Sequence, residues 1–202
     1  MASLFFEKDL WRRSFTRVAG VDEAGRGPLA GPVVAAAVIF SAGQKFIPGV
    51  NDSKKLSAGQ RLALKPVIEG QALAIGIGVV HEAEIDAINI LQAALKAMQM
   101  AVHNLALQPD FLLIDGNRPP DTPLPFSCIV KGDAKSMSIA AASIIAKVTR
   151  DDMMVEYDRL YPQYGFSRHK GYPTPKHISA IRLHGLCPVH RRSFKPKGLS
   201  LT

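Results

Sequence analysis

Apolar residues along the chain fall into short β-branched runs that alternate with longer stretches of helical spacing. The short runs predict five strands, which lie at Val18–Val21, Val33–Phe40, Ala72–Val80, Phe111–Ile114 and Phe126–Val130. The clearest is Val33–Phe40, which is bounded by Pro32 and Ser41. Strands that alternate with helices are typical of an α/β or α+β domain, so we expect a mixed five-stranded sheet flanked by helices.

Helical spacing is strongest between Glu82 and Leu105. Apolar side chains recur there at steps of three and four residues, which places them on one helical face. They are Ile85, Ile88, Leu91, Leu95, Met98, Val102 and Leu105. A second long helix is predicted to begin soon after Asp133 and to run towards Tyr157. Its small residues at Ala140–Ala142 would let a neighbouring backbone approach closely.

Two shorter helices are marked by their ends. A capping box at Ser57–Gln60 predicts a helix that continues to about Glu69. Pro66 lies inside this helix and is expected to kink or shorten it, because proline removes an interior hydrogen bond. A final helix is predicted over about Thr174–His184, with Gly185 as its C-cap.

Composition is that of an ordinary globular chain. Of 202 residues, 47% are hydrophobic and 21% are charged, which argues against disorder and allows a sizeable core. The length predicts one domain over residues 1–202, with a small helical and basic C-terminal part from about residue 160. The longest apolar run, Pro28–Phe40, is interrupted by Gly31 and is too short to span a membrane.

The cysteines and the N-terminus indicate a compartment. Cys128 and Cys187 are too few for a disulfide scaffold or a zinc cage, so we expect two free thiols in a reducing environment. The first ten residues contain early acids and no long apolar segment, so no signal peptide is predicted. We therefore expect a cytoplasmic protein. Since no exposed apolar stripe is evident, we expect a monomer without an obligate protein partner.

Charge is the first pointer to function. Lys and Arg number 25 against 17 for Asp and Glu, a formal net charge of +8. Excess positive charge suits a nucleic-acid partner, but a solvated basic surface has the same composition. The C-terminal part is markedly basic at 168–170 and 190–192, with Lys195 and Lys197 beyond. Some of these residues are expected to contact phosphates and others to be solvated.

Four carboxylates fall at predicted strand ends. Asp22 and Glu23 follow one strand, Asp115 ends another, and Asp133 comes shortly after a third. Any one of them alone could be a turn, cap or loop residue. Together they would repel one another strongly, and such a cluster is tolerable when hard cations such as Mg²⁺ or Mn²⁺ neutralise it. In a basic protein, this pattern favours metal-assisted phosphodiester hydrolysis.

A glycine motif offers a different interpretation. Residues Gly25–Ala30 match the G-x-G-x-x-G/A fingerprint of dinucleotide-binding oxidoreductases. The fingerprint must open a helix, whereas a strand is predicted after it, and two acids precede it. We expect Gly25 and Gly27 to expose their N–H groups to a sugar or phosphate without a side-chain clash. A tight turn between two strands is compatible with this use. A third hypothesis, a non-catalytic nucleic-acid-binding module, rests on the charge alone.

A series of motifs resembles bacterial ribonuclease HII, of the type 2 ribonuclease H family. The blocks are Asp22–Val33, Asn51–Ser57, Leu113–Asn117, Val130–Asp133, Ala141–Asp151, His169–Thr174 and His190–Phe194. They come in the family's order and cover nearly the whole chain. No part of the sequence resembles the large N-terminal domain of the sister type, ribonuclease HIII, which favours the HII type.

The resemblance implies a fold, a reaction and a substrate. The fold is ribonuclease H-like, and the C-terminal part would help to bind substrate. The reaction is Mg²⁺- or Mn²⁺-dependent hydrolysis of RNA in RNA–DNA hybrids and at single ribonucleotides embedded in duplex DNA. The cut lies 5′ of the ribonucleotide and leaves a 5′-phosphate and a 3′-hydroxyl. The implied roles are ribonucleotide removal from DNA and RNA primer removal.

The resemblance also assigns residues. Asp22, Glu23, Asp115 and Asp133 are the implied catalytic and metal-binding acids. Gly25, Arg26 and Gly27 would read the ribose 2′-hydroxyl largely through backbone, Tyr172 would sense the sugar with its ring, and Lys54 would contact a phosphate. Tyr172 could instead be a buried ring with a hydrogen-bonded tip. Asp151 is interpreted as a hydrogen-bonding helical residue, and a catalytic Asp151 is the main alternative.

Overall fold

A mixed five-stranded sheet forms the centre of the molecule in a computed structural model that describes residues 2–194. The strands are β1 (Val18–Ala24), β2 (Val33–Ile39), β3 (Ala74–Val80), β4 (Phe111–Asp115) and β5 (Phe126–Ile129), in the order β3-β2-β1-β4-β5. The pairs β1–β2 and β2–β3 are antiparallel, whereas β1–β4 and β4–β5 are parallel. The predicted sheet of five strands is confirmed.

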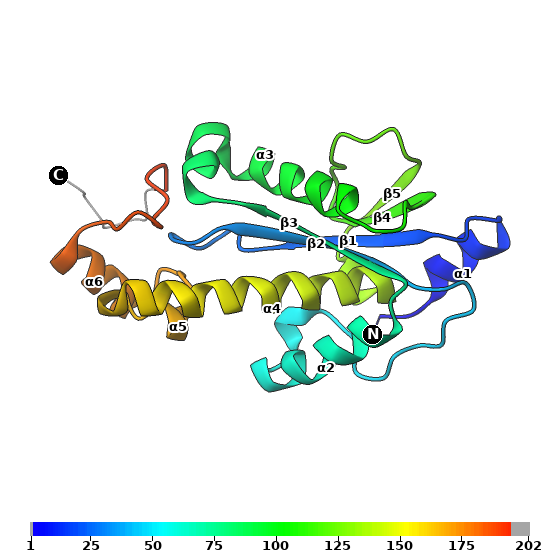
Figure 1. The fold of residues 1–202 in the computed structure, drawn as a ribbon, viewed down its shortest axis with the longest axis horizontal. Coiled ribbons are helices and arrows are strands. Elements are labelled where there is room, and N and C mark those ends of the chain that lie inside the picture. The colour runs from blue at the N-terminus through cyan, green and yellow to red at the C-terminus, as the bar shows by residue number, and fades with distance from the viewer. Residues whose placement is uncertain (1, 195–202) are drawn as a thin grey trace.

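Helices cover both faces of the sheet (Figure 1). They are α1 (Phe5–Arg12), α2 (Ala58–Gln71), α3 (Glu82–His103), α4 (Met137–Leu160), α5 (Phe166–His169) and α6 (Pro175–His184). Figure 1 shows α3 on one face and α4 on the other, with α2 outside α4 and with α5 and α6 near the end of α4. None of the helices in residues 2–194 combines the length and apolar character that a membrane crossing requires.

Strand β2 is buried on both faces because its side chains alternate between two cores. Ala35 and Ala37 belong to the core under α3, whereas Ala36 and Val38 belong to the core under α4. On the α4 side the helix lies very close to β1. A Cβ added to Gly20 would lie 2.2 Å from the carbonyl carbon of Ser138, so only glycine allows this approach.

Helix α1 was not predicted from the sequence. Its Glu7 is 1% exposed, and its Oε1 atom accepts hydrogen bonds from the hydroxyl of Ser136 at 2.6 Å and the N–H of Ser138 at 2.9 Å. These contacts occupy donors at the N-terminus of α4, where the first N–H groups of a helix lack partners. Helix α1 therefore fixes the start of α4, next to the turn that carries Asp133.

Two of the predicted helices differ from the prediction in their interior. Helix α2 has the expected capping box and continues through Pro66 to Gln71, so the prediction that Pro66 shortens it is wrong. Pro66 is exposed, which leaves the unpaired carbonyl free to bond water. Helix α3 breaks at Asn89, whose φ is 68°. The Oδ1 atom of Asn89 accepts from the N–H groups of Leu91 and Gln92, so it caps the second segment.

Candidate functional site

The predicted acids lie where the parallel strands end. The last β1–β4 pair is Val21 with Ile114, and Asp22 and Asp115 are the next residues on their strands. Asp133 lies in a 3₁₀ helix, Gly132–Ala134, that follows β5. The Oδ1 atom of Asp115 accepts from the N–H of Gly132 at 2.6 Å, which ties the end of β4 to this turn.

The prediction that the strand ends before Asp22 is wrong. Strand β1 continues to Ala24 because β2 still pairs with it, Asp22 with Ala36 and Glu23 with Ala35. Although both are paired strand residues, Asp22 and Glu23 both lie close enough to Asp115 for its charge to raise their pKa values. Asp22 is 2% exposed, whereas Glu23 lines a hollow on the α3 side.

Asp22 is the most buried of the four acids. Burial raises its pKa well above the ordinary value, and the charges of Glu23 and Asp115 add to the effect. Its Oδ1 atom accepts from the N–H of Glu23 at 2.7 Å. Its Oδ2 atom is buried and has no hydrogen-bond partner among residues 2–194. An unpartnered buried carboxylate oxygen is costly unless something binds it.

Glu23 and Asp133 are perturbed for related reasons. Burial raises the pKa of Glu23, although Arg26, with Nη1 at 3.3 Å from Oε1, acts to lower it. Burial raises the pKa of Asp133 to about 6, with the charges of Asp115 and Asp52 adding to the rise. The carboxylates of the site therefore repel one another, and the positive charge near them does not fully offset this repulsion.

Lys54 supplies part of that positive charge. Its Nζ atom lies 3.9 Å from Oδ2 of Asp133, and its side chain is 79% exposed. Partial burial acts to lower the pKa of Lys54, but the charges of Asp22, Asp133 and Asp52 raise it above the ordinary value. The ammonium group therefore stays charged and free to reach outward to an anion.

The four acids fit a hard divalent cation in their chemistry. Every atom that they offer to a metal is a carboxylate oxygen, the ligand that Mg²⁺ and Mn²⁺ prefer. One of these oxygens, Oδ2 of Asp22, is buried without a hydrogen-bond partner. Across residues 2–194, no three Asp, Glu, His or Cys side chains are already grouped closely enough to hold a metal ion. Neighbouring carboxylates raise the pKa values of Asp22 and Asp133, and a bound cation would offset that repulsion.

A hollow of about 260 Å³ adjoins the acids. Its lining combines Glu23 and Asp115 with the guanidinium-bearing Arg26 and Arg118, and α3 forms the apolar wall. Negative and positive groups thus share one concave surface. Such a surface can hold a cation and a phosphate together.

The glycine motif forms a turn between two strands. Gly25 has a φ of +97°, and β2 follows from Val33. No helix opens after Gly25–Ala30, which removes the structural requirement of a dinucleotide fingerprint. A Cβ added to Gly27 would lie 3.7 Å from Cε1 of Tyr172. The structure therefore brings the glycine motif and Tyr172 together, although they are far apart in sequence.

Tyr172 is available at the surface. Its side chain is 42% exposed, so the alternative of a buried ring is wrong. The Nζ atom of Lys147 lies 6.0 Å from the ring centroid. A ring in this position offers one face and one edge to a sugar beside Gly27.

Two of the basic C-terminal residues are buried, which was not expected. Arg191 and His190 are 1% and 2% exposed, so they are neither phosphate contacts nor solvated charges. Lys195 and Lys197 lie outside the described residues. Asp52 was not assigned a role, yet its charge acts on both Asp133 and Lys54. Its place in the Asn51–Ser57 block was the only available signal.

Asp151 lies among cations rather than among the four acids. Its Oδ1 atom is 2.6 Å from Nζ of Lys147, and its Oδ2 atom is 3.8 Å from Nη2 of Arg61. This agrees with the interpretation as a hydrogen-bonding helical residue. The two free cysteines, Cys128 and Cys187, also agree with expectation.

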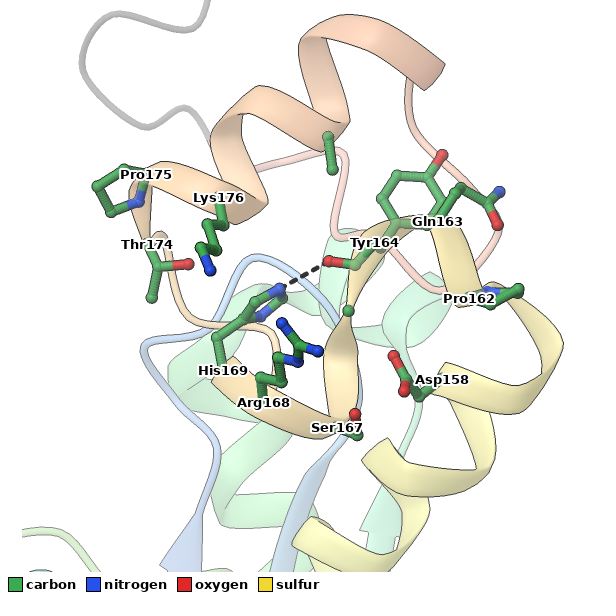
Figure 2. Close-up of a pocket in the computed structure, with 12 residues that line it drawn as sticks. Asp158, Pro162, Gln163, Tyr164, Ser167, Arg168, His169, Thr174, Pro175 and Lys176 are labelled. Carbon is green, nitrogen blue, oxygen red and sulfur yellow. Dashed lines mark hydrogen bonds between the residues drawn. The ribbon is translucent and has the colours of Figure 1, made fainter.

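A pocket of about 890 Å³ lies elsewhere, between the end of α4 and helices α5 and α6 (Figure 2). Figure 2 shows His169 projecting towards the backbone of Tyr164, and its Nε2 atom lies 2.8 Å from the carbonyl oxygen. None of the four acids, the glycine motif, Lys54 or Tyr172 lines this pocket, although Arg168 and His169 of the basic segment do. The pocket is therefore not the carboxylate site.

Comparison with known proteins gives the family. The family model for ribonuclease HII matches residues 19–197. Ribonuclease HII of Acetivibrio thermocellus is 58% identical over 189 residues, which cover 94% of this chain and 73% of that protein. Ribonuclease HII of Chlorobium phaeovibrioides is 54% identical over 200 residues, which cover 96% of this chain and 97% of that protein.

A solved structure agrees with the sequence relatives. The crystal structure of ribonuclease H2 from Pyrococcus horikoshii OT3 superposes with a TM-score of 0.74 at 30% identity, covering 89% of this chain and 94% of that one. The mixed sheet flanked by helices is thus the ribonuclease H-like fold. With the carboxylates at the strand ends and the matched relatives, the chain belongs to the ribonuclease HII family, whose members are divalent-metal-dependent ribonucleases H.

Proposed function

We propose that this ribonuclease H hydrolyses RNA in RNA–DNA hybrids and cuts duplex DNA 5′ of a single embedded ribonucleotide. It acts as a monomer with Mg²⁺ or Mn²⁺, in ribonucleotide removal from DNA and in RNA primer removal. The observation that carries the proposal is the location of mutually perturbed carboxylates beside the contact between Gly27 and Tyr172. The acids and the residues proposed to recognise the sugar are then close to one another.

The four acids have the catalytic role in this proposal. Asp22, Glu23, Asp115 and Asp133 hold the divalent cation, which activates water and stabilises the leaving oxygen when bound. Water oxygen joins phosphorus, the P–O3′ bond breaks, and O3′ leaves with a proton. The products are a 3′-hydroxyl and a 5′-phosphate on the ribonucleotide side. Burial of Asp22 supports this role, since its unpartnered Oδ2 atom gains a ligand.

The neighbouring residues select and hold the substrate. Gly25, Arg26 and Gly27 read the ribose 2′-hydroxyl through backbone, because the 2′-hydroxyl is the group that separates RNA from DNA. Tyr172 packs against the sugar at the junction, which its exposure and its closeness to Gly27 support. Lys54 contacts the phosphate near the cut, which its exposed ammonium group beside Asp133 supports.

The test is cleavage of an end-labelled DNA duplex that contains one ribonucleotide. The arms are Mg²⁺, Mn²⁺ and a chelator, with an all-DNA duplex of the same sequence as control and an RNA–DNA hybrid as the second substrate. We expect metal-dependent cutting 5′ of the ribonucleotide and in the hybrid, and an intact control. Metal-independent binding to every duplex without product would instead support a non-catalytic binding module.

A further inference from the structure

Arg191 and Arg150 are buried cations without an acidic partner. They are 1% and 0% exposed, and within residues 2–194 neither forms an ion pair with a carboxylate. Moving a charged group out of water is costly in free energy when no opposite charge pairs with it. A buried guanidinium without an acidic partner therefore needs other compensation. Here the compensation comes from backbone carbonyl groups: those of the turn that carries the glycine motif and, for Arg150, also that of Lys170.

Arg191 uses its full set of donors on that turn. A guanidinium has five N–H donors in a fixed fork. Arg191 makes five hydrogen bonds, each to a carbonyl oxygen of the turn. The acceptors and distances are Gly25 at 2.6 Å, Arg26 at 3.1 Å, Pro28 at 2.9 Å, Gly31 at 2.9 Å and Pro32 at 3.1 Å. The side chain thus lies against one side of the whole turn.

This arrangement fixes the direction of the amide groups. The peptide bonds of the described residues are trans, so the N–H of each peptide unit points away from its carbonyl oxygen. The carbonyls of Gly25 and Arg26 point to Arg191, so the N–H groups of Arg26 and Gly27 point away from it. Neither N–H has a hydrogen-bond partner within residues 2–194.

The next N–H of the turn, that of Leu29, shows the same geometry with a partner in place. The carbonyl of Pro28 points to Arg191, and the N–H of the following residue, Leu29, donates to the carbonyl of Gly171 at 2.8 Å. Gly171 precedes Tyr172. The side of the turn opposite Arg191 is therefore the side that faces the segment carrying the Tyr172 ring, near Gly27.

Arg191 is itself held firmly in place. Its own N–H donates to the carbonyl of Leu29 at 2.8 Å, and the N–H of Gly31 donates to the carbonyl of Val189 at 2.9 Å. Beyond it, the N–H groups of Arg192 and Ser193 both donate to the carboxylate of Asp86 at 2.8 and 2.9 Å. The segment therefore presents the guanidinium at a fixed position under the turn.

We propose that Arg191 is a positioning residue for sugar recognition, and that it aims the free N–H groups of Arg26 and Gly27 at the ribose 2′-hydroxyl. It does so from behind the turn, without touching substrate. This inference rests on the proposed function, because it assumes that the turn meets a ribonucleotide. It adds to that function a buried residue, Arg191, which has no part in the roles proposed for the four acids and the Tyr172 ring.

Arg191→Lys is the test variant and Arg150→Lys is its matched control. Lysine keeps the charge but has only three donors, so it cannot replace all five hydrogen bonds. The carbonyl of Pro32 keeps its bond from Nε of Arg150, and at least one of the other four carbonyls is left without a partner. Arg150 makes three hydrogen bonds, to the carbonyls of Pro32, Lys170 and Ala30, and none of these belongs to the peptide units that carry the N–H groups of Arg26 or Gly27. A lysine at 150 matches that number of acceptors.

The first readout is cleavage of the duplex with one ribonucleotide, well below the melting temperature of either variant. We expect Arg191→Lys to lower kcat/KM by about 30-fold or more, and Arg150→Lys to stay within about threefold of the parent. Arg191→Lys within threefold of the parent, or an equal loss in both variants, would overturn the inference. If the unmodified protein shows no metal-dependent cleavage, the proposed function fails instead.

The second readout separates positioning from support of the fold. Glycine is labelled with ¹⁵N, and the Gly27 amide, assigned with Gly27→Ala, is followed without metal as duplex is added. In the unmodified protein, we expect the chemical shift of the Gly27 amide to change more with the ribonucleotide duplex than with the all-DNA duplex. In folded Arg191→Lys, we expect the two duplexes to change it equally. If Arg191→Lys does not fold, the unmodified protein still decides, because a Gly27 amide that responds equally to both duplexes overturns the inference.

Discussion

The Nε2 atoms of His177 and His190 lie 3.1 Å apart among the buried side chains of the C-terminal helices. One arrangement of protons satisfies their contacts. The N–H of Cys187 donates to Nδ1 of His190 at 3.0 Å, so the proton of His190 is on Nε2 and points to His177. His177 then carries its proton on Nδ1 and donates it to the carbonyl of Tyr172 at 2.9 Å. Two neutral imidazoles thus hold the backbone of Tyr172.

These imidazoles predict a loss of stability in acid. Burial, first, and nearby histidines lower the pKa of His177 and of His190 to about 4, from 6.5 in the unfolded chain. The groups that face them are the His169 ring, stacked on His177 at 4.3 Å, the Cys187 thiol and the Tyr164 ring. The unfolded chain takes up protons first, so stability is complete above about pH 6.5 and is lost as the pH falls towards about 4. The loss is on the order of 3 kcal/mol for each imidazole.

Thermal melts between about pH 4 and about pH 7.5 check this prediction. His177→Asn should flatten the dependence of the melting temperature on pH, because one of the two groups is removed. His103→Asn, which removes an exposed histidine, should leave it steep. An equally steep dependence in His177→Asn would show that these imidazoles do not control acid stability.

Asp115→Asn should abolish turnover and keep the fold. The amide retains an oxygen for the N–H of Gly132, and removal of the charge relieves repulsion with Asp22 and Asp133. We expect kcat to fall by about 1,000-fold, an increase of about 4 kcal/mol in the activation barrier, with a melting temperature that is unchanged or higher. Cleavage and melting of Asp115→Asn are compared with those of Asp121→Asn, an exposed acid in the Pro-rich loop. Normal cleavage by Asp115→Asn would remove this residue from the proposed site.

Tyr172→Ala should lower turnover at a single embedded ribonucleotide more than it lowers stability. The ring is 42% exposed, so its removal leaves little cavity, whereas the sugar loses its packing surface. We expect a loss of about tenfold to 100-fold in kcat/KM and less than about 1 kcal/mol of unfolding free energy. Tyr172→Phe keeps the ring and should retain most of the activity. If Tyr172→Ala cleaves as fast as the parent, the sugar-sensing role is wrong.

The sheet and the acids could be predicted from sequence because both follow from local patterns. The run Val33–Phe40 is apolar throughout, and burial on both faces of a sheet accounts for that. Asp22 and Asp115 were found because each directly follows a predicted apolar run. The extension of β1 past Asp22 was missed because it depends on pairing with β2, which the residues of β1 do not reveal.

Residues that act through distant contacts were not predictable. Arg191 looked like one more basic residue, but its five acceptors lie about 160 residues earlier in the chain. Helix α1 was missed because it is short, and because its main anchor, Glu7, is a charged residue whose partners, Ser136 and Ser138, lie 129 and 131 residues later in the chain. A buried charge with remote partners leaves no periodic signal in the sequence.

Gly27→Ala should weaken substrate use without weakening the fold. An added Cβ would meet nothing closer than 3.7 Å, an ordinary contact with the Tyr172 ring. It would, however, stand between the backbone and an approaching sugar. We expect KM to rise by about tenfold or more and the melting temperature to stay within a few degrees. Gly25→Ala is the contrasting variant, because its Cβ would lie 2.2 Å from Nε of Arg150 at a positive φ, so it should lose stability as well. An unchanged KM in Gly27→Ala would show that substrate does not approach this backbone.

Asp151→Asn decides whether a fifth acid belongs to the catalytic group. Asp151 pairs with Lys147 and Arg61, and Arg61 donates to the carbonyl of Ser53 at 2.8 Å, in the 3₁₀ helix Ser53–Lys55 that carries Lys54. These contacts link Asp151 to the segment that presents Lys54, so we expect it to support that segment rather than to act on a phosphate. We expect a loss of about 1–2 kcal/mol of unfolding free energy, with kcat within about threefold of the parent.

Asp152→Asn is the matched control for that variant. Its side chain is 60% exposed and 3.7 Å from Nζ of Lys65, so its loss should cost less than about 0.5 kcal/mol. Urea unfolding and cleavage of the single-ribonucleotide duplex are measured on both variants. A fall in kcat for Asp151→Asn as large as that for Asp115→Asn, at normal stability, would place Asp151 with the metal-binding acids. A loss of stability with kcat intact would keep it as a support for the Lys54 segment, because an amide cannot replace the charge that holds Arg61 and Lys147.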